Sequence, residues 1–384
     1  MPDHAACVCC GAAALAPLGP VGLRPGSVLS DSRPCAIPAR VEVCEVCGHL
    51  QKRHDEADRR AIAALYADYR AHHLSRGNEQ PAFAAGGAPM PRTQVALERI
   101  LPRLPARGRL LDFGCGNGAA LRSASRLLPG WELHGADLDA QHREEVLAIP
   151  GVARFHPGAV IPADAAAGGF DLVVLWHVAE HLTAPVEVLR SVGGLLAPDG
   201  LVLVSVPDVQ RTVFDLAVLD HVSHFSVAGL GRVLGRAGYA VVEDGQAWLH
   251  NCATLLCRRG AGGPEPRLLP PGDGAWPEGR GCVEALRSVT ERFEACAARG
   301  PYALFGVGMA SLWLLGQLSR APACLVDEDP ARQGQRVGGI PVVAPAQLPA
   351  GLDLLLPFAP PTARALAARL GPGLPGRALV GPEG

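Results

Sequence analysis

Two pairs of cysteines near the start of the chain have the spacing Cys-x-x-Cys, Cys7 with Cys10 and Cys44 with Cys47. Thiolates at that spacing can occupy two corners of a tetrahedron around Zn²⁺, and two such pairs complete a closed site. Because four sulfur ligands leave no open position, we expect this zinc to be structural and not catalytic. The alternative is a set of ordinary buried or redox-active thiols.

A glycine-rich turn follows the apolar run that begins at Arg109. Its glycines let the backbone approach a ligand closely, and the helix expected after the turn offers free N–H groups. Similar turns occur in dinucleotide-binding enzymes, so the turn does not identify the ligand by itself. The residues of this segment that we expect to contact a cofactor are Asp112, Gly114, Cys115, Gly116 and Gly118.

An acidic side chain lies at the end of the next expected strand, where Asp137 follows Gly135 and Ala136 and precedes Leu138. A carboxylate at that place can bind both hydroxyls of a ribose. The later apolar run FDLVVLW ends at Trp176 and is followed by His177. We expect Asp137, Leu138, Trp176 and His177 to belong to the same cofactor site.

These segments, together with LLAPDGL, occur in one order over residues 90–250 and resemble class I S-adenosylmethionine-dependent methyltransferases. The resemblance implies S-adenosylmethionine as the cofactor. It also implies that the three glycines of the turn lie beneath the methionine moiety and Asp137 on the ribose. Trp176 and His177 are then expected near the methyl group.

The stretch VLDHVSHFS, residues 218–226, contains the histidines of a possible proton-transfer site. Methyl transfer from a sulfonium requires mainly that the nucleophile and the methyl carbon be aligned at about 3 Å. Where the nucleophile must lose a proton, His221 is the first candidate base, because imidazole titrates near neutrality and Asp220 or another carboxylate could orient it. His181 and His224 are further candidates. Each histidine could instead be a capping or packing residue.

The whole order of segments also resembles the three-domain sugar C-methyltransferases that act on nucleotide-linked deoxysugars. The matching pieces are CVCCG, VCEVCGHLQ, the motifs above, YALFGVG and VDEDPARQGQRVGGIPV. The resemblance implies a zinc-binding front, a methyltransferase core and a C-terminal half-Rossmann domain. In that family the catalytic stretch reads Tyr-His-Glu-His, whereas Val218 and Asp220 stand here where Tyr and Glu would be. Methylation at carbon or at oxygen therefore stays open.

The elements that must position these residues are short apolar runs alternating with amphipathic stretches from Arg109 onward, which predicts a parallel sheet. Residues 259–282 are rich in Pro and Gly and predict a linker. The predicted α/β architecture is a zinc-binding module at 1–53, a doubly wound methyltransferase domain with a helical lead-in at 54–258, that linker, and a Rossmann-like α/β domain at 283–384.

The last of these units has its own glycine turn, at Gly306 and Gly308, with Asp327 at the end of the next expected strand. Such a turn could cradle the nucleotide part of a substrate at a helix N-terminus. A purely structural half-Rossmann domain would have the same appearance.

Composition argues against several partners. A formal net charge of -2 gives no field that attracts polyanions, so no nucleic-acid partner is expected. Pro, Gly and charged residues interrupt every apolar run before the roughly 18 residues of a membrane span, and the N-terminus does not resemble a secretory signal. We expect a cytoplasmic protein without membrane contact, whose cysteines are thiols or metal ligands. The oligomeric state stays open.

The sequence thus predicts an enzyme that methylates a small molecule, by first choice a nucleotide-linked sugar. One alternative is a methyltransferase of another natural-product intermediate, with the C-terminal unit as scaffold. A second is a non-catalytic module whose zinc ribbon binds RNA or a protein. A third is a nicotinamide oxidoreductase that uses the C-terminal turn. Binding measurements with S-adenosylmethionine and with NAD separate the last from the first.

Overall fold

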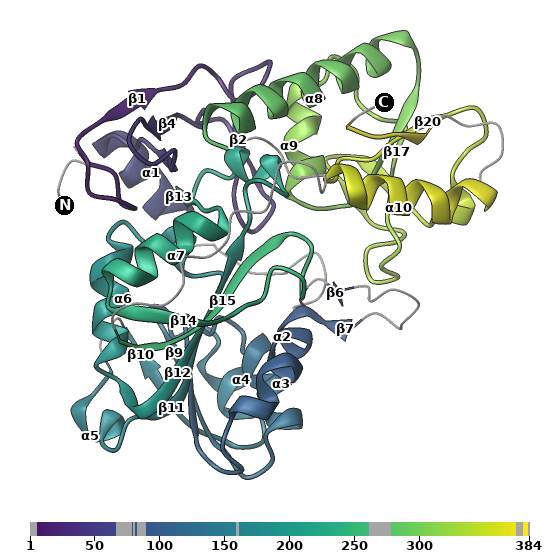
Figure 1. The fold of residues 1–384 in the computed structure, drawn as a ribbon. Coiled ribbons are helices and arrows are strands. Elements are labelled where there is room, and N and C mark those ends of the chain that lie inside the picture. Colours follow the sequence, from purple (N-terminus) through teal and green to yellow (C-terminus); the bar gives the residue numbers. More distant parts are fainter. Residues whose placement is uncertain are drawn as a thin grey trace.

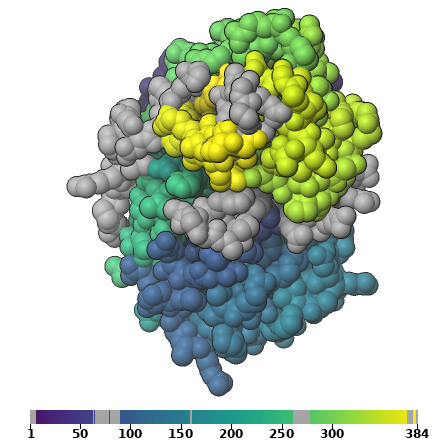
Figure 2. Space-filling model, turned by 90° about the vertical axis from the view of Figure 1, so that its right-hand side faces the viewer, coloured from purple at the N-terminus to yellow at the C-terminus, as the bar shows by residue number. Residues whose placement is uncertain are grey.

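The chain forms three main sheets with helices packed on them (Figure 1). The largest sheet occupies one end of the molecule, whereas the N-terminal strands and the C-terminal unit lie at the other end (Figure 1). Figure 2 shows the C-terminal unit, in yellow and light green, above the blue part of the central domain. The computed structural model describes residues 6–66, 79, 81–82, 90–158, 161–260, 278–373 and 379–382.

The central sheet has the strand order β10-β9-β8-β11-β12-β15-β14. The first five strands in that order are parallel, whereas β15 runs antiparallel to both of its neighbours. The predicted doubly wound α/β fold is confirmed, but the antiparallel β15 was not expected from the alternation of strands and helices. The bounds are β8 Arg109–Phe113, β9 Glu132–Asp137, β10 Val152–Pro157, β11 Phe170–Trp176, β12 Leu196–Pro207, β14 Tyr239–Asp244 and β15 Cys252–Arg259.

Helices cover both faces of this sheet because successive side chains of a strand point to opposite sides. Leu172 and Val174 of β11 join an apolar cluster with α2, α3 and α4, whereas Val173 and Leu175 join another with α6 and α7. A strand that is buried on both faces explains the continuous apolar run FDLVVLW. The bounds are α2 Arg92–Ile100, α3 Ala119–Leu127, α4 Arg143–Leu147, α5 Ala163–Ala166, α6 Pro185–Gly193 and α7 Val227–Arg236.

The N-terminal sheet has the order β1-β4-β5-β13, and its neighbouring strands are antiparallel. Its fourth strand, β13, belongs to the histidine-containing stretch at 218–226. The predicted zinc module is therefore completed by a strand from the segment assigned to the methyltransferase domain. The bounds are β1 Leu15–Pro17, β2 Ser27–Val28, β3 Pro34–Cys35, β4 Val41–Cys44, β5 Leu50–Lys52, α1 Glu56–Tyr66, β6 Pro81–Ala82, β7 Met90–Pro91 and β13 Ser223–His224.

The C-terminal sheet has the order β18-β19-β17-β16-β20-β21, in which only the edge strand β18 is antiparallel within the described residues. Helix α8 begins at Arg280, inside the predicted linker, and residues 261–277 of that linker lie outside the described residues. The bounds are α8 Arg280–Arg299, β16 Tyr302–Phe305, α9 Met309–Gln317, β17 Cys324–Val326, β18 Arg336–Val337, β19 Ile340–Val343, β20 Asp353–Leu355, α10 Pro360–Leu370 and β21 Leu379–Val380.

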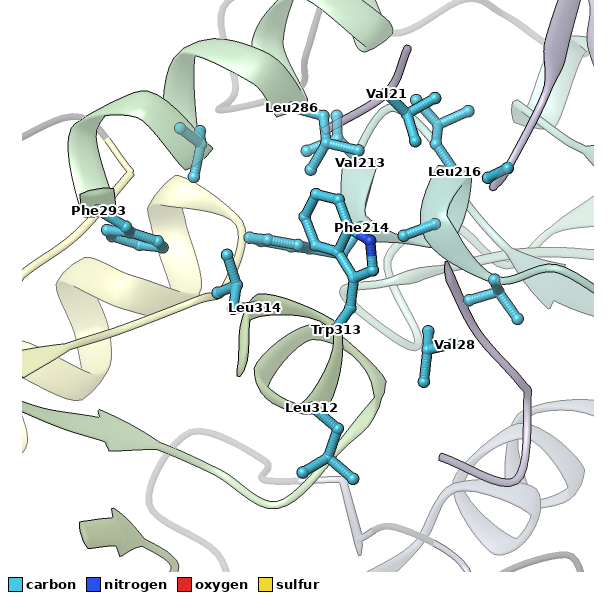
Figure 3. Close-up of a cluster of buried hydrophobic side chains, with 14 of the residues drawn as sticks. Val21, Val28, Val213, Phe214, Leu216, Leu286, Phe293, Leu312, Trp313 and Leu314 are labelled. Atoms are coloured by element: carbon cyan, nitrogen blue, oxygen red, sulfur yellow. The ribbon is translucent and has the colours of Figure 1, made fainter. Parts of the chain in front are cut away.

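One apolar cluster joins the N-terminal segment, the segment after β12 of the central domain and the C-terminal unit (Figure 3). Val21 and Val28 from the N-terminal segment, Phe214 from the central domain and Trp313 of α9 belong to it. The Trp313 and Phe214 rings are 6.2 Å apart at an angle of 71°. The small N-terminal segment thus buries its apolar side chains in a core that it shares with the other units.

None of the helices in the described part of the chain is both long and apolar enough to cross a membrane.

Candidate active site

The glycine turn joins β8 to α3 at the carboxyl edge of the central sheet. Gly114, Gly116 and Gly118 have φ angles of 82°, 49° and 83°, a region that favours glycine. A Cβ atom at Gly114 would lie 2.5 Å from Val178, and one at Gly118 would lie 2.6 Å from Ile149. At Gly116 it would meet nothing within 4 Å. The turn therefore packs tightly at two glycines and faces open space at the third, where a ligand can approach the backbone.

Asp137 ends β9 beside this turn. Its Oδ2 accepts a hydrogen bond from the Gly116 N–H at 2.8 Å, and its Oδ1 accepts one from the Asp139 N–H at 3.2 Å. The carboxylate is half-buried, and Leu138 next to it is 79% exposed. An acidic group and an exposed apolar side chain thus border the open side of Gly116.

Asp112, on β8 just before the turn, is buried, and its Oδ1 has no hydrogen-bond partner within the described residues. Burial, with the nearby Asp137 and Glu79 carboxylates, raises the pKa of Asp112 to about 8. Burial also raises the pKa of Glu79, which accepts a hydrogen bond from the Thr93 hydroxyl at 2.5 Å. The sequence prediction did not include Glu79. Together these groups give the region a surplus of acidic side chains that favours a cation.

Cys115 is buried next to the turn. Burial raises the pKa of its thiol well above the usual range, and the nearby Asp112 and Asp137 carboxylates raise it further. It is therefore a neutral packing group. Its Sγ atom would lie 3.0 Å from a Cβ placed at Gly135. The cysteine fills the space between the turn and β9.

His177 follows β11 with a φ of 55°, which is unusual for a residue other than glycine. Its Nδ1 lies 3.0 Å from Glu180 Oε1, and its Nε2 lies 3.9 Å from Cys252 Sγ. Burial lowers the pKa of His177, but Cys252 and Glu180 outweigh burial and raise the pKa to about 9. Arg92 contacts the same sulfur. Burial raises the pKa of Cys252, but the Arg92 charge and His177 have the larger effect and lower it. The half-buried Trp176 meets the His177 ring edge-on at 5.7 Å.

His221 and His224 share one carboxylate, that of Asp215 in the buried segment Val213–Ala217. Asp215 Oδ1 lies 2.6 Å from His221 Nδ1, and Oδ2 lies 2.5 Å from His224 Nδ1. Burial opposes ionisation of Asp215, but the two histidines hold its pKa well below the usual range. Burial lowers the pKa of His221, but Asp215 has the larger effect, so the pKa of His221 is raised. The ionised carboxylate fixes both rings with their Nδ1–H groups toward it.

Of the carboxylates that could orient His221, Asp220 or another, the one hydrogen-bonded to that ring is Asp215. Asp220 instead accepts from Ser30, with its Oδ1 2.8 Å from the backbone nitrogen and its Oδ2 2.5 Å from the hydroxyl. Its backbone carbonyl lies 2.9 Å from His181 Nδ1. The reason is that both Asp220 oxygens are bound by Ser30 of the N-terminal segment, whereas Asp215 lies between the His221 and His224 rings. Asp220 therefore holds the loop and His181 in place.

Glu180, His181 and His221 surround one small region, because their donor atoms lie within 4.8 Å of one another. The His181 and His221 rings are perpendicular, with centroids 4.8 Å apart. His181 has a side chain that is 25% exposed, whereas that of His221 is 4% exposed. Glu180 Oε2 is buried without a hydrogen-bond partner in the described structure. The predicted bases His181 and His221 thus lie together, and the more exposed of the two is His181.

The four cysteines predicted as zinc ligands form one group that could hold a metal ion. The Sγ atoms of Cys7 and Cys47 are 3.7 Å apart, and those of Cys10 and Cys44 are 3.5 Å apart. Zn–S bonds of about 2.3 Å in a tetrahedron require sulfur atoms about 3.8 Å apart, so the donor set fits Zn²⁺. The glycine after each pair has a positive φ, 83° and 74°, which closes each turn around the sulfur atoms.

Comparison with known proteins agrees with this geometry. Residues 92–244 match a family model described as a methyltransferase domain. The match spans β8, the glycine turn, Asp137, His177 and the stretch at 218–226. The chain contains a class I S-adenosylmethionine-dependent methyltransferase domain.

Two curated relatives share this methyltransferase domain. Over 126 residues the chain is 34% identical to a ribosomal protein L11 methyltransferase of Bordetella parapertussis, covering 33% of this chain and 39% of that protein. Over 135 residues it is 30% identical to a ubiquinone biosynthesis O-methyltransferase of Xanthomonas axonopodis pv. citri, covering 33% of this chain and 54% of that protein. The chain thus spans about two fifths to one half of the length of these relatives.

Among solved structures, an S-adenosylmethionine-dependent methyltransferase from Clostridium acetobutylicum is similar to 53% of this chain, over 99% of its own length. Its sequence identity is 10% and its TM-score is 0.37. An O-methyltransferase from neocarzinostatin biosynthesis, solved with S-adenosylmethionine, is similar over 40% of this chain and 49% of its own, at 21% identity and a TM-score of 0.35.

The methyltransferase domain brings the predicted cofactor residues and the predicted histidine bases to the same edge of its sheet. Gly116, Asp137 and His177 follow the carboxyl ends of β8, β9 and β11, where ligands bind in open α/β sheets. The loop with His221 follows β12 at that edge. The sequence did not single out Asp215, Glu79, Cys252 or Arg92. For Asp215 a signal existed, since a lone carboxylate inside the apolar run VFDLAVL needs a partner when buried.

Proposed function

We propose that the protein transfers a methyl group from S-adenosylmethionine to a sugar carried on a nucleotide. The observation that carries the cofactor assignment is the acidic, open cradle at Gly116. The backbone there is accessible on one side, Asp137 borders it, and Asp112 keeps a buried oxygen without a partner in the described structure. A cofactor with a sulfonium and an ammonium group fits such a site, because both charges are positive.

When bound, S-adenosylmethionine supplies an electrophilic methyl group. Gly116 and Asp137 would hold the cofactor, and Asp112 would face its positive charges. The Nδ1–H of His221 donates to Asp215, so the ring Nε2 keeps its lone pair and can accept the proton that the sugar carbon or hydroxyl loses. His181, the more exposed imidazole, would bind the substrate next to that nitrogen.

The sugar assignment is supported by the order of parts, because a cysteine-rich front, a methyltransferase domain and a C-terminal α/β sheet resemble the three-domain sugar C-methyltransferases. A second candidate is O-methylation of another small biosynthetic intermediate. It is favoured by the similarity to an O-methyltransferase of ubiquinone biosynthesis over 135 residues.

The test is methyl transfer from labelled S-adenosylmethionine to a panel of nucleotide-linked deoxysugars and phenolic intermediates. We expect turnover with a nucleotide sugar and a loss of about a hundredfold or more in kcat for His221→Asn, with unchanged cofactor affinity by calorimetry. His250→Asn, which changes an exposed imidazole, is the control. Binding of NAD in place of S-adenosylmethionine, or normal turnover by His221→Asn, would contradict the proposal.

The base role also has a pH signature. His221 must be neutral to accept a proton, and its pKa lies above the ordinary value. The kcat should therefore increase with pH, with an apparent pKa higher than about 6.5, and it should be low at pH values below that pKa. A flat kcat profile between pH 6 and pH 9 would count against His221 as the base.

We further propose that the four cysteines bind one structural zinc ion. Cys10→Ser should lose zinc, measured by elemental analysis of the purified protein. Cys35→Ser is the control, because Cys35 is a cysteine of β3 that lies outside the group of four. Equal zinc content in both variants would refute this assignment.

A further inference from the structure

Lys52 is the single lysine of a chain that holds 35 lysine and arginine residues, and it is buried at 1% exposure. A buried amine is costly unless its N–H groups are bound. Its Nζ lies 2.7 Å from the Leu216 carbonyl and 2.7 Å from His224 Nε2. An arginine at this place would be larger and could not lose its charge. Lysine suits this position better than arginine, because its amine is smaller and can lose its charge when buried.

The backbone fixes this contact from both sides. Lys52 ends β5, which pairs with β13 in the register Gln51 with Ser223 and Leu50 with His224. The Lys52 N–H also donates to the Val222 carbonyl at 2.8 Å. The N-terminal sheet thus carries Lys52 to the histidine-containing loop of the methyltransferase domain.

The side chains form one hydrogen-bonded series from Lys52 through His224 and Asp215 to His221. The Nδ1–H of His224 donates to Asp215, so the Nε2 of that ring carries a lone pair. This Nε2 accepts a hydrogen bond from Lys52, whose amine can donate whether or not it is charged. Burial and the charge of Lys52 lower the pKa of His224 to about 3, so this ring is neutral. Burial lowers the pKa of Lys52 itself to about 7.

From this series we propose that Lys52 is a positioning residue of the methyltransferase site, which fixes the tautomer of His224 and, through Asp215, the orientation of the base His221. The inference rests on the proposed role of His221. Without a donor at its Nε2, His224 can turn its N–H to that side, and Asp215 then loses one of its two partners. The Asp215 carboxylate becomes free to rotate, and the His221 ring with it.

The charged and titratable groups that face this series come from four parts of the chain. Removal of the Lys52 amine takes away the positive charge that opposes protonation of the imidazoles. The pKa of His221 should then rise, which moves the acid limb of kcat to higher pH. The groups are Lys52 on β5, Glu180 and His181 after β11, Asp215 before the loop, and Asp220, His221 and His224 within it.

Three variants test the proposal in the full-length, zinc-loaded protein. Lys52→Met removes the donor and the charge, and Lys52→Gln keeps an N–H donor without the charge. Arg53→Gln removes a charge one residue away, on a side chain that is 68% exposed, and is the matched control. For Lys52→Met we expect kcat to fall about ten- to hundredfold and its acid limb to move up by about one pH unit. The KM for S-adenosylmethionine and the zinc content should stay unchanged.

Lys52→Gln should recover part of kcat, because its amide can donate to His224, while the acid limb stays shifted. A purely structural role for Lys52 predicts something different, namely a lower melting temperature with an unmoved pH profile in the folded fraction. That result, or a normal kcat in Lys52→Met, would overturn the proposal.

A readout that does not need turnover is the ¹⁵N chemical shift of the imidazole nitrogens. In the parent protein His224 should show a protonated Nδ1 and an unprotonated Nε2, and Lys52→Met should mix the two tautomers. An unchanged His224 spectrum would refute the proposal even if activity fell. If Lys52→Met and Arg53→Gln both keep full turnover while His221→Asn is inactive, only the Lys52 inference fails. If the parent protein transfers no methyl group, the proposed function fails and the inference with it.

Discussion

The chain contains two glycine turns that are anchored by the same pattern of hydrogen bonds to an aspartate. At the first, the Gly116 N–H donates to Asp137 Oδ2 at 2.8 Å. At the second, the Val307 N–H donates to Asp327 Oδ2 at 2.8 Å. In each case the other oxygen of the carboxylate accepts from the N–H two residues later. Both turns end a parallel strand and begin a helix, so the same local rules build them.

The charges around the two turns differ. Beside Asp327, the Arg332 guanidinium lies 3.0 Å from the carboxylate and neutralises it. Beside Asp137 lie two further acidic side chains, Asp112 and Glu79, and burial together with the Asp137 and Glu79 carboxylates raises the pKa of Asp112. The second residue before the first glycine is Asp112 in β8, whereas it is Leu304 in β16. The fold alone therefore does not make a cofactor site, and the acidic surplus distinguishes the turn that we assign to a cationic ligand.

The largest expected effect comes from filling the open face of the first turn. Gly116→Arg should abolish measurable S-adenosylmethionine binding in calorimetry, because the side chain would occupy the space that the glycine leaves empty. Gly306→Arg changes a glycine with a similarly positive φ of 86° in the second turn and should leave that affinity intact. Equal loss in both variants would mean that the two turns are not functionally different.

A smaller effect is expected at the two carboxylates. Asp137→Asn should weaken S-adenosylmethionine binding about ten- to hundredfold, which corresponds to about 1.5–3 kcal/mol for hydrogen bonds to a charged group. Asp327→Asn should instead lower the free energy of unfolding by about 1–3 kcal/mol, since the buried ion pair between Arg332 and Asp327 is lost, with cofactor affinity unchanged. Calorimetric titration and urea unfolding of both variants give the comparison. A reversed pattern would move the cofactor to the C-terminal turn.

The smallest effect is a pH dependence that only the first turn should show. The pKa of Asp112 is raised to about 8, so the folded protein keeps this carboxyl protonated at neutral pH. A bound cation favours the ionised form, so binding should release a proton, and affinity should rise about fivefold between pH 7 and pH 8. Calorimetry in buffers of different ionisation enthalpy measures that proton. Asp112→Asn should remove the dependence, and a parent protein with constant affinity over this range would contradict the assignment.

The elements and the glycine turn after β8 were predictable because each depends on neighbours in sequence. The apolar runs at β8 and β11 and the positive-φ glycines mark strands and turns without reference to the rest of the chain. The spacing within each Cys-x-x-Cys pair likewise determines how its two thiols lie relative to each other. The antiparallel β15 was not predicted, since strand direction depends on which neighbour the strand finds in the folded sheet.

The hydrogen-bonded series was less predictable because its members come from distant segments. Asp220 is adjacent to His221 in sequence and was the one carboxylate that the sequence named for orienting it, yet Asp215 is hydrogen-bonded to that ring and Asp220 reaches Ser30. Lys52 and His224 are 172 residues apart, and no local pattern joins them. The one available signal was compositional, because a lone lysine among many arginines marks a position with a special requirement.

The pairing of β5 with β13 has a consequence for synthesis of the chain. With 172 residues between Lys52 and His224, and translation at about 5–20 residues per second, the outer edge of β5 waits about 10 to 35 s for its partner strand. During that time its N–H and C=O groups are available to other chains, so a nascent protein stalled in this interval should be the form most prone to aggregate.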